Sequence, residues 1–201
     1  MTLPVGIRVA IASTLVLSAC ATVSPTAAPD GPAATAERAF RQQLSLGGRL
    51  SVRYQGPQKE EAIHGSFSWA QTAERTTVTL LSPLGQTVAL IEAGPAGATM
   101  TQAGQPLRVA ADVDTLTAEA LGWPLPVAGM RDWLQGFATD PEGRRAVASP
   151  ARDTLLTRDG WRIHYAAWSD DGRPRRIDLA RNTQQAGEVS IRIVIDTWQA
   201  S

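Results

Sequence analysis

Hydrophobic and polar residues alternate over most of the chain after residue 45, which predicts strands with one buried and one wetted face. The alternating segments are 46–54, 63–69, 78–91, 98–101, 107–109, 161–165, 177–179 and 189–195. The segment 78–91 is interrupted by Ser82-Pro83-Leu84-Gly85, whose residue types favour a hairpin turn. The pattern therefore predicts eight or more antiparallel strands.

Three short segments have helical spacing instead. They are residues 35–46, residues 112–122, which begin with aspartates suited to an N-cap and end with a glycine suited to a C-cap, and residues 127–137. Residues 138–150 have neither period and are predicted to form a loop. The apolar positions behind the three helices are Ala36, Phe40 and Leu44; Val113, Leu116, Ala120 and Leu121; and Val127, Met130, Trp133, Leu134 and Phe137.

This many one-sided strands expose a large apolar surface that a few short helices cannot cover if the sheet is flat. We therefore expect the sheet to curl into a full or partial barrel whose mouth is capped by helices. Such a barrel either encloses an apolar cavity or has a filled core, and the periodicity does not distinguish the two.

Leu84 occupies the turn position that Asn, Asp or Gly normally takes. Two interpretations follow for this bulky apolar side chain at the tip of a turn. It either folds back onto its own hairpin or a neighbouring loop, or projects as an apolar finger into a partner such as a lipid bilayer.

The first residues predict a secreted, lipid-anchored protein. Arg8 precedes a short apolar run, and residues 17–20 (Leu-Ser-Ala-Cys) match a bacterial lipobox, so residues 1–19 are predicted to be a lipoprotein signal peptide. Cys20 is the single cysteine of the chain and stands where lipidation requires it. Residues 20–37 are rich in Ala, Thr, Pro and Ser and read as a flexible tether, followed by one domain over 38–201. Ala21, in place of an aspartate, favours the outer membrane.

The charge of the chain and the motifs that it lacks argue against several classes of function. The formal net charge is zero, with 19 basic and 19 acidic residues, which argues against a nucleic-acid partner. His64 and His164 both fall on the polar phase of their strands, without a nucleophile or a ligand carboxylate at suitable spacing. The chain also lacks a P-loop, a dinucleotide fingerprint and a GxSxG elbow. We therefore expect no enzyme, no metal and no cofactor apart from the lipid on Cys20.

A series of short motifs, in order, resembles the outer-membrane lipoprotein receptor family LolB. The resemblance covers residue 38 to the C-terminus and the lipobox. The motifs are GRLSV (48–52), GSFSW (65–69), LLSPLG (80–85), GWPLP (122–126), WLQG (133–136), GWRIHY (160–165) and IDTW (195–198).

The resemblance implies a mainly β fold, an unclosed antiparallel β-barrel of about eleven strands, with a helical lid over a hydrophobic cavity that holds acyl chains. It implies a protein, lipid-anchored on the periplasmic side of the outer membrane, that accepts lipoproteins from a LolA-like periplasmic carrier and inserts them into the inner leaflet. We also expect a monomer. Pro83, Leu84 and Gly85 would form the membrane-inserting loop. The predicted acyl-chain cavity is lined by Leu50, Val52, Phe67, Trp69, Leu80, Met130, Trp133, Trp161, Ile163, Ile191 and Ile193.

Two alternatives remain from the residues alone. A lipoprotein carrier or chaperone for lipids or other hydrophobic ligands would need the cavity but no apolar finger at Leu84. A structural outer-membrane lipoprotein would have a filled core and exposed patches on the outer face of its sheet.

Overall fold

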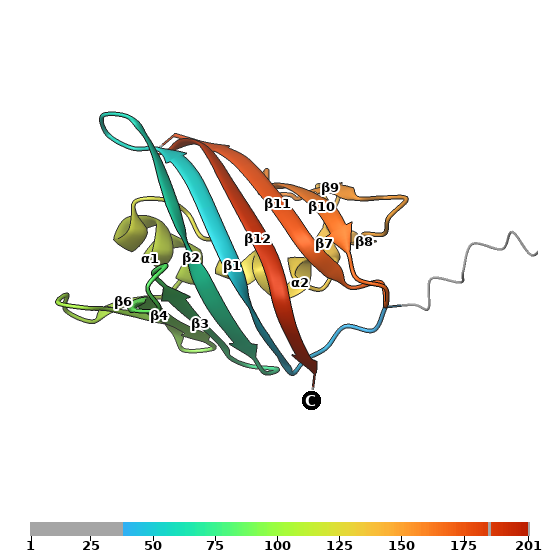
Figure 1. Ribbon diagram of the computed structural model, residues 1–201, viewed down its shortest axis with the longest axis horizontal. Helices are drawn as coiled ribbons and strands as arrows, with labels where there is room; N and C mark the ends of the chain where they lie inside the picture. Colours follow the sequence, from blue (N-terminus) through green and yellow to red (C-terminus); the bar gives the residue numbers. More distant parts are fainter. Residues whose placement is uncertain (1–37, 185, 201) are drawn as a thin grey trace, which may run out of the picture. The chain divides into compact units, whose positions relative to one another are not determined.

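The computed structural model describes residues 38–184 and 186–200. The predicted signal peptide, Cys20, the tether and the start of the predicted helix at 35–46 lie outside these residues. The described residues form twelve strands and two helices (Figure 1). In chain order the elements are β1 (Leu44–Gln55), β2 (Glu60–Gln71), β3 (Thr76–Leu81), β4 (Thr87–Gly94), β5 (Gly97–Gln102), β6 (Arg108–Ala110), α1 (Val113–Leu121), α2 (Val127–Trp133), β7 (Phe137–Thr139), β8 (Arg145–Val147), β9 (Thr154–Leu156), β10 (Arg162–Trp168), β11 (Pro174–Thr183) and β12 (Gly187–Ala200).

Ten strands form one antiparallel sheet in the order β6-β5-β4-β3-β2-β1-β12-β11-β10-β9. The two end strands, β6 and β9, do not pair with each other, so the sheet is an open barrel rather than a closed one. Strands β7 and β8 pair only with each other. The prediction of a mainly β, unclosed antiparallel fold is confirmed, with twelve strands in place of about eleven.

The strand register aligns buried side chains in rows across the sheet. Ile163 pairs with Leu179, which pairs with Ile191, which in turn pairs with Val52. All four side chains are at most 2% exposed. Because successive residues of a strand face opposite sides, this register turns one apolar face of the sheet inward across β10, β11, β12 and β1.

The two helices cover this inward face and form the lid (Figure 1). Helix α1 begins at the N-cap Asp112, whose carboxylate accepts a hydrogen bond of 2.7 Å from the Thr115 amide, and ends at Gly122 in the left-handed conformation. It packs against β5 and β6, and α2 packs against α1 and β7. The second and third predicted helices therefore exist.

The first predicted helix is wrong in its described part. Residues 38–43 are not helical, and Leu44 and Leu46 belong to β1. Leu44 pairs with Gln71 of β2 and with Ala200 of β12. Pairing on both sides buries both leucines in the sheet, which outweighs the weak helical preference of the segment.

The predicted loop at 138–150 is also wrong, because it contains the hairpin of β7 and β8. Helix α2 ends at Trp133, three residues before Gly136, whose φ is +83°. Phe137 consequently lies in β7 instead of continuing the helix. Strand β9 had no signal in the sequence, since it is only three residues long.

Candidate functional site

The eleven residues of the predicted acyl-chain cavity all lie on the inner side of the fold, between the sheet and the lid. Each is at most 9% exposed, and all belong to a single hydrophobic cluster. We call this set the concave cluster: Leu50, Val52, Phe67, Trp69, Leu80, Met130, Trp133, Trp161, Ile163, Ile191 and Ile193.

Strand pairing brings distant parts of the concave cluster together. Phe67 pairs with Leu80, and Leu50 pairs with Ile193. The indole N–H of Trp69 is satisfied by the side-chain oxygen of Gln71 at 2.9 Å, so the tryptophan presents only apolar surface to the cluster. The side chains of the concave cluster therefore present hydrocarbon and aromatic surface.

Two tryptophans link the lid to the sheet. The ring of Trp133 on α2 lies 6.1 Å from that of Trp161, which directly precedes β10. Gly129 makes room for Trp133, because a Cβ at position 129 would overlap the indole ring. The hydroxyl of Tyr165 on β10 donates a hydrogen bond of 3.1 Å to the carbonyl of Trp133. Burial raises the pKa of Tyr165, so this hydroxyl remains a donor at neutral pH.

Arg131 fastens the other side of α2 to the turn between β2 and β3. Its guanidinium donates to the carbonyls of Thr72 (2.7 Å), Ala73 (3.3 Å) and Arg75 (3.0 Å), and to the hydroxyl of Thr76 (2.5 Å). A planar guanidinium has five N–H donors in a rigid arrangement, so one side chain can hold a whole turn. The role of Arg131 was not predictable from the sequence, because a single arginine on a helix has no distinctive pattern.

A buried pair of glutamines holds the segment that leads into β1. The Gln135 side chain accepts from the Arg41 amide (2.8 Å) and donates to the Arg41 carbonyl (3.1 Å), which also accepts from Gln71 (3.0 Å). Both glutamines are at most 3% exposed. Gln135 belongs to the WLQG motif, which by itself did not indicate this role.

Asp114 on α1 is half-buried and links the two helices of the lid. Its carboxylate accepts a hydrogen bond of 3.0 Å from the amide of Ala128 in α2. Burial raises the pKa of Asp114 to about 6, against the opposing effect of this hydrogen bond. The contact between the two lid helices therefore includes a carboxyl group that titrates near neutral pH.

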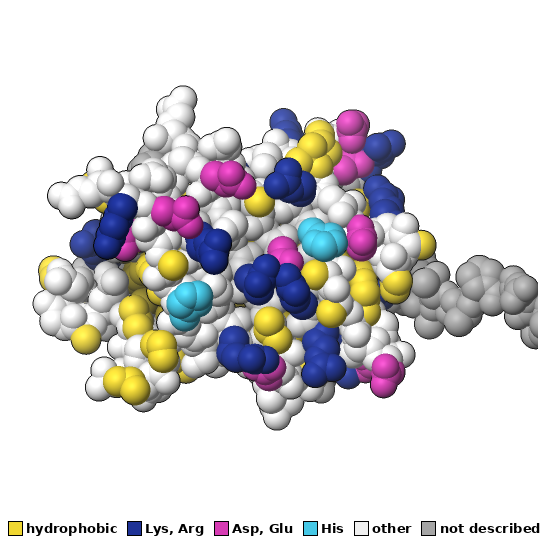
Figure 2. All heavy atoms as spheres, turned by 45° about the horizontal axis from the view of Figure 1, so that its top comes forward, with side chains coloured by type: hydrophobic (Ala, Val, Ile, Leu, Met, Phe, Trp, Pro, Cys, Tyr) yellow, Lys and Arg dark blue, Asp and Glu magenta, His cyan; other side chains and the backbone are white. Residues whose placement is uncertain are grey.

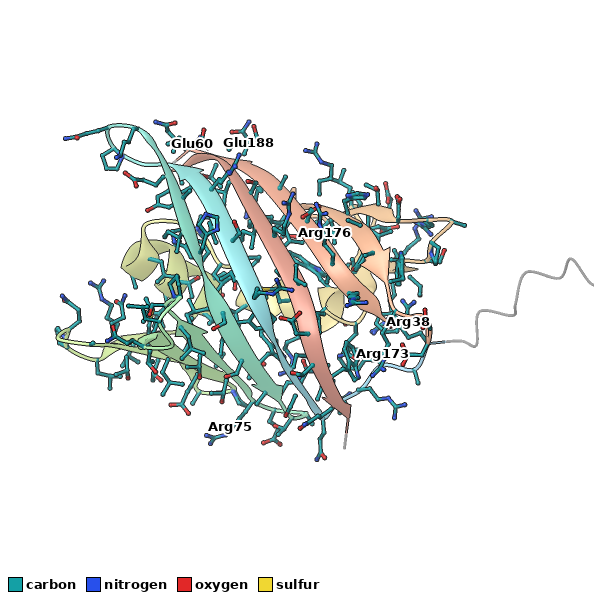
Figure 3. All side chains as sticks on the ribbon, in the orientation of Figure 1. Arg38, Glu60, Arg75, Arg173, Arg176 and Glu188 are labelled. Atoms are coloured by element: carbon teal, nitrogen blue, oxygen red, sulfur yellow. The ribbon has the colours of Figure 1, made fainter. Side chains whose placement is uncertain are left out.

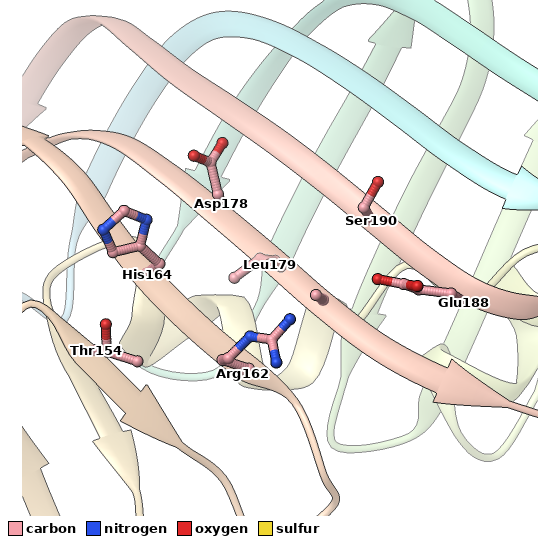
Figure 4. Close-up of a pocket in the computed structure, with 8 residues that line it drawn as sticks. Thr154, Arg162, His164, Asp178, Leu179, Glu188 and Ser190 are labelled. Atoms are coloured by element: carbon pink, nitrogen blue, oxygen red, sulfur yellow. The ribbon is translucent and has the colours of Figure 1, made fainter.

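Two pockets lie on the outer, polar face of the sheet. The first has a volume of about 400 Å³ and is lined by residues that include Arg162, His164, Glu188 and Ser190 (Figure 4). The second, of about 340 Å³, is lined in part by residues of β1 and β2. Both are separated by the sheet from the concave cluster, which is packed against α1 and α2 in this structure.

Several charged groups of this outer face form ion pairs with one another. Asp178 accepts hydrogen bonds of 2.8 Å from both Arg176 and Arg192 (Arg176 is labelled in Figure 3). Partial burial acts to raise the pKa of Asp178, but the hydrogen bonds from Arg192 and Arg176 outweigh it and lower the pKa. The Nε2 atom of His164 lies 3.7 Å from a carboxylate oxygen of Asp153. The spacing of residues along the sequence did not reveal this neighbour.

Within residues 38–184 and 186–200, no three His, Cys, Asp or Glu side chains lie together in a way that could hold a metal ion. In the same residues no helix has the length and apolarity needed to cross a membrane.

Leu84 projects into solvent, with 87% of its surface exposed. The turn is closed by the Gly85 amide donating to the Ser82 carbonyl (2.8 Å) and by the Ser82 amide donating to the Gln86 carbonyl (2.8 Å). Gly85 has a φ of +78°, which glycine adopts at little cost. This compact turn presents Leu84 at its tip, so the interpretation that the side chain folds back is wrong.

Comparisons with known proteins identify the family. A LolA superfamily protein from Nitrosomonas europaea aligns with a TM-score of 0.48 and 11% identity, over 82% of this chain and 89% of that one. The outer-membrane lipoprotein LolB of Cupriavidus necator is 43% identical over 185 residues, which cover 90% of each chain. The LolB of Thiobacillus denitrificans is 38% identical over 198 residues, covering 96% of this chain and 98% of the relative. Residues 42–198 match the profile of the family described as outer membrane lipoprotein LolB. The chain therefore belongs to the LolB family of outer-membrane lipoproteins.

Proposed function

We propose that this protein receives acylated lipoproteins from a LolA-like periplasmic carrier and inserts them into the inner leaflet of the outer membrane. The acyl chains bind against the concave cluster, under the lid, and Leu84 enters the leaflet to bring the mouth of the barrel to the membrane. Membership of the LolB family confirms the expected class, an outer-membrane lipoprotein receptor rather than an enzyme.

The observation that carries the proposal is that the β3–β4 hairpin has both a buried apolar face and an exposed apolar tip. Its inward side chains, among them Val78, Leu80 and Ile91, are at most 7% exposed and lie in the hydrophobic cluster. Its tip carries Leu84 at 87% exposure. One rigid hairpin thus joins an apolar interior to an apolar contact point in solvent, which suits a protein that passes hydrocarbon to a membrane.

Acyl-chain transfer of this kind needs no nucleotide. Each CH₂ group buried contributes about 0.8 kcal/mol, so moving a chain from one apolar cavity to another is close to balanced. The direction of transfer is then set by affinity for the acyl chain. The receptor binds the chain slightly more tightly than the carrier does, and the bilayer binds it more tightly than either.

Entry of an acyl chain requires the lid to move, because the concave cluster is packed against α1 and α2. The bonds that hold α2, from Tyr165 and from Arg131, set part of the free energy of that movement. The lipid expected on Cys20 supplies the anchor, and two or three acyl chains hold a protein far more firmly than one inserted leucine. Loss of Leu84 is therefore expected to impair delivery rather than anchoring.

The test is a transfer assay with the lipidated full-length protein reconstituted in phospholipid vesicles. A LolA-like carrier loaded with acylated cargo is added, and cargo is measured in the carrier, in complex with the receptor and in the lipid. Native protein is expected to empty the carrier and deliver the cargo. Leu84→Glu is expected to take the cargo and retain it.

Leu156→Glu is the matched control, because Leu156 is another exposed leucine, 54% accessible, on the edge strand β9. It is expected to deliver at the native rate. If native protein takes nothing from the carrier, the receptor function is wrong and a structural lipoprotein becomes the better account.

A further inference from the structure

The outer face of the sheet differs between its two halves. On β1, β12, β11 and β10 the outward positions carry many ionised side chains, among them Arg53, Arg192, Asp178 and Arg162. On β3, β4, β5 and β6 they carry mainly leucine, valine and threonine, and the ionised groups among the described exposed residues of these strands are Glu92 and Arg108. Figure 2 shows the basic side chains gathered over the first half and hydrophobic side chains at the end formed by β3–β6, on the left.

Three exposed hydrophobic residues of this second half accompany Leu84. Val88, at the start of β4, is 44% exposed, while Leu107, which precedes β6, and Val109, within β6, are 62% and 69% exposed. On an ordinary solvent-exposed strand face, a polar residue would be expected at position 109 instead of valine. We call Leu84, Val88 and Leu107 the apolar rim, whereas Val109 lies further along the sheet, where it pairs with Thr99.

The strand register places the apolar rim at one end of the sheet. Leu81 pairs with Thr87 and Ala89 pairs with Gln102, so β3, β4 and β5 meet at the end where the β3–β4 turn leaves the sheet. Arg108 pairs with Met100. The turn between β5 and β6, which contains Leu107, therefore leaves the sheet at the same end as the turn that contains Leu84.

The charges of this end suit a phospholipid surface. Residues 82–87 and residues 102–107 contain no ionised side chain. Arg108, which follows them directly, is exposed and makes no ion pair with any residue that the structure describes. Uncharged apolar tips beside a single guanidinium match the order of a leaflet, with hydrocarbon below and phosphate at the surface.

We propose that the apolar rim is a continuous membrane-contact surface, in which Leu107 inserts beside Leu84 while Arg108 binds lipid phosphate. The inference rests on the proposed function, which uses Leu84 alone, and names a second contact for it. One inserted leucine lets the protein rotate about a point, whereas two hairpin tips fix the orientation of the barrel mouth relative to the leaflet. The occupant is lipid, because the surface is continuous with Leu84 and carries little charge for a protein partner to recognise.

The experiment reports depth in the membrane directly. Cys20 is the single cysteine of the chain and is expected to be acylated, so one added cysteine can carry an environment-sensitive fluorophore. The full-length lipidated protein is labelled in Leu84→Cys, Leu107→Cys or the control Leu156→Cys, with the native chain as the labelling blank. Each is reconstituted in phosphatidylethanolamine and phosphatidylglycerol vesicles with brominated acyl chains, without carrier or cargo.

Probes at positions 84 and 107 are expected to be quenched at least about twofold relative to vesicles without bromine, and the probe at 156 to be unaffected. Quenching at 84 without quenching at 107 overturns the apolar rim and leaves the proposed function intact. Quenching at neither position contradicts both, and quenching at 107 alone removes Leu84 from the contact and contradicts both as stated. Equal quenching at all three positions overturns the rim, because the contact would then be unspecific.

A delivery measurement adds a functional readout. Full burial of a leucine side chain is worth enough to change a rate by about tenfold, so Leu107→Glu is expected to slow delivery by up to that factor while uptake from the carrier stays native. Leu156→Glu is expected to deliver normally. Slowed uptake with normal delivery would identify this face as a docking surface for the carrier and overturn the assignment to lipid.

Discussion

Tyr165 and Trp133 join the sheet to the lid through one buried hydrogen bond, from the tyrosine hydroxyl to the tryptophan backbone carbonyl, over 3.1 Å. Both side chains are at most 4% exposed. The carbonyl belongs to the last residue of α2, where helical carbonyls lack partners within the helix. This carbonyl also accepts a hydrogen bond of 3.0 Å from the Gly136 amide, so the tyrosine hydroxyl is its second donor and holds α2 on β10.

Tyr165→Phe is expected to lower the free energy of unfolding by about 1 kcal/mol, because it removes a buried hydrogen bond while the Trp133 carbonyl keeps the bond from the Gly136 amide. Chemical denaturation followed by circular dichroism measures the change. Tyr54→Phe is the control, since Tyr54 is half-buried and its hydroxyl has no hydrogen bond to a described residue. Equal stability of the two variants would contradict a role for the Tyr165 hydroxyl.

Arg131→Gln is expected to loosen the lid, because it removes most of the four hydrogen bonds to the turn at residues 72–76. Hydrogen exchange of the α2 amides is expected to speed up roughly tenfold, which corresponds to about 1.4 kcal/mol. Arg49→Gln provides the comparison, since Arg49 forms an exposed ion pair of 2.9 Å with Asp196 on the outer face. Unchanged protection of α2 in Arg131→Gln would show that the turn does not hold the lid.

Asp114 is expected to make the stability of the lid depend on pH. Its pKa is about 6 in the fold and 3.8 when unperturbed, so the folded state holds the proton more tightly than the unfolded state. The resulting stabilisation is fully present below about pH 3.8 and is lost as the pH rises through 6. Asp114→Asn is therefore expected to gain stability relative to the native protein between pH 4 and pH 7, by about 2 kcal/mol.

Asp112→Asn is the matched control for this prediction. The hydrogen bonds from Thr115 lower the pKa of Asp112, so its charged form stabilises the fold and that contribution is lost as the pH falls. Its stability relative to native protein should have the opposite slope with pH. A parallel pH dependence of Asp114→Asn and native protein would contradict the titration of Asp114.

Leu84→Glu is expected to change the free energy of unfolding by less than about 0.5 kcal/mol, because the side chain is 87% exposed. Thermal unfolding of native and variant protein checks this. A large loss of stability would mean that failed delivery by this variant reflects misfolding, and the role of Leu84 would then have to be tested by the fluorescence measurement alone.

The fold was predictable where one side of a strand is buried. Alternation placed Leu50, Val52, Phe67 and Trp69 on the same face, and the structure buries all four. The second helix was predictable from its ends, since Asp112 and Gly122 have opposite capping preferences. These signals are local, so a single sequence carries them.

The errors occurred where distant residues decide the structure. Leu44 and Leu46 lie in a segment whose apolar residues have helical spacing in the sequence. In the structure they pair instead with strands β2 and β12. The hairpin of β7 and β8 has three residues in each strand, which is too short for a period to be read. The number of strands was underestimated for the same reason.

The candidate site was predictable in its apolar part only. The residues of the concave cluster follow from strand phase and from the resemblance to LolB. The sequence placed Leu84 in a turn but left open whether its side chain is exposed. The bonds that hold the lid do not, because Arg131 and Tyr165 find their partners about 55 to 59 and 32 residues away in sequence. The apolar rim was hidden likewise, since Leu107 and Leu84 meet at one end only through the register of β4 and β5.

The most direct test is to locate a bound acyl chain. Cargo lipoprotein with a photoreactive group at the end of one acyl chain is transferred from its carrier to the native protein, irradiated, and mapped by mass spectrometry. Cross-links are expected on peptides that contain residues of the concave cluster, such as Trp133, Ile163 and Ile191. Cross-links confined to the outer face, around His164 and Ser190, would contradict the account.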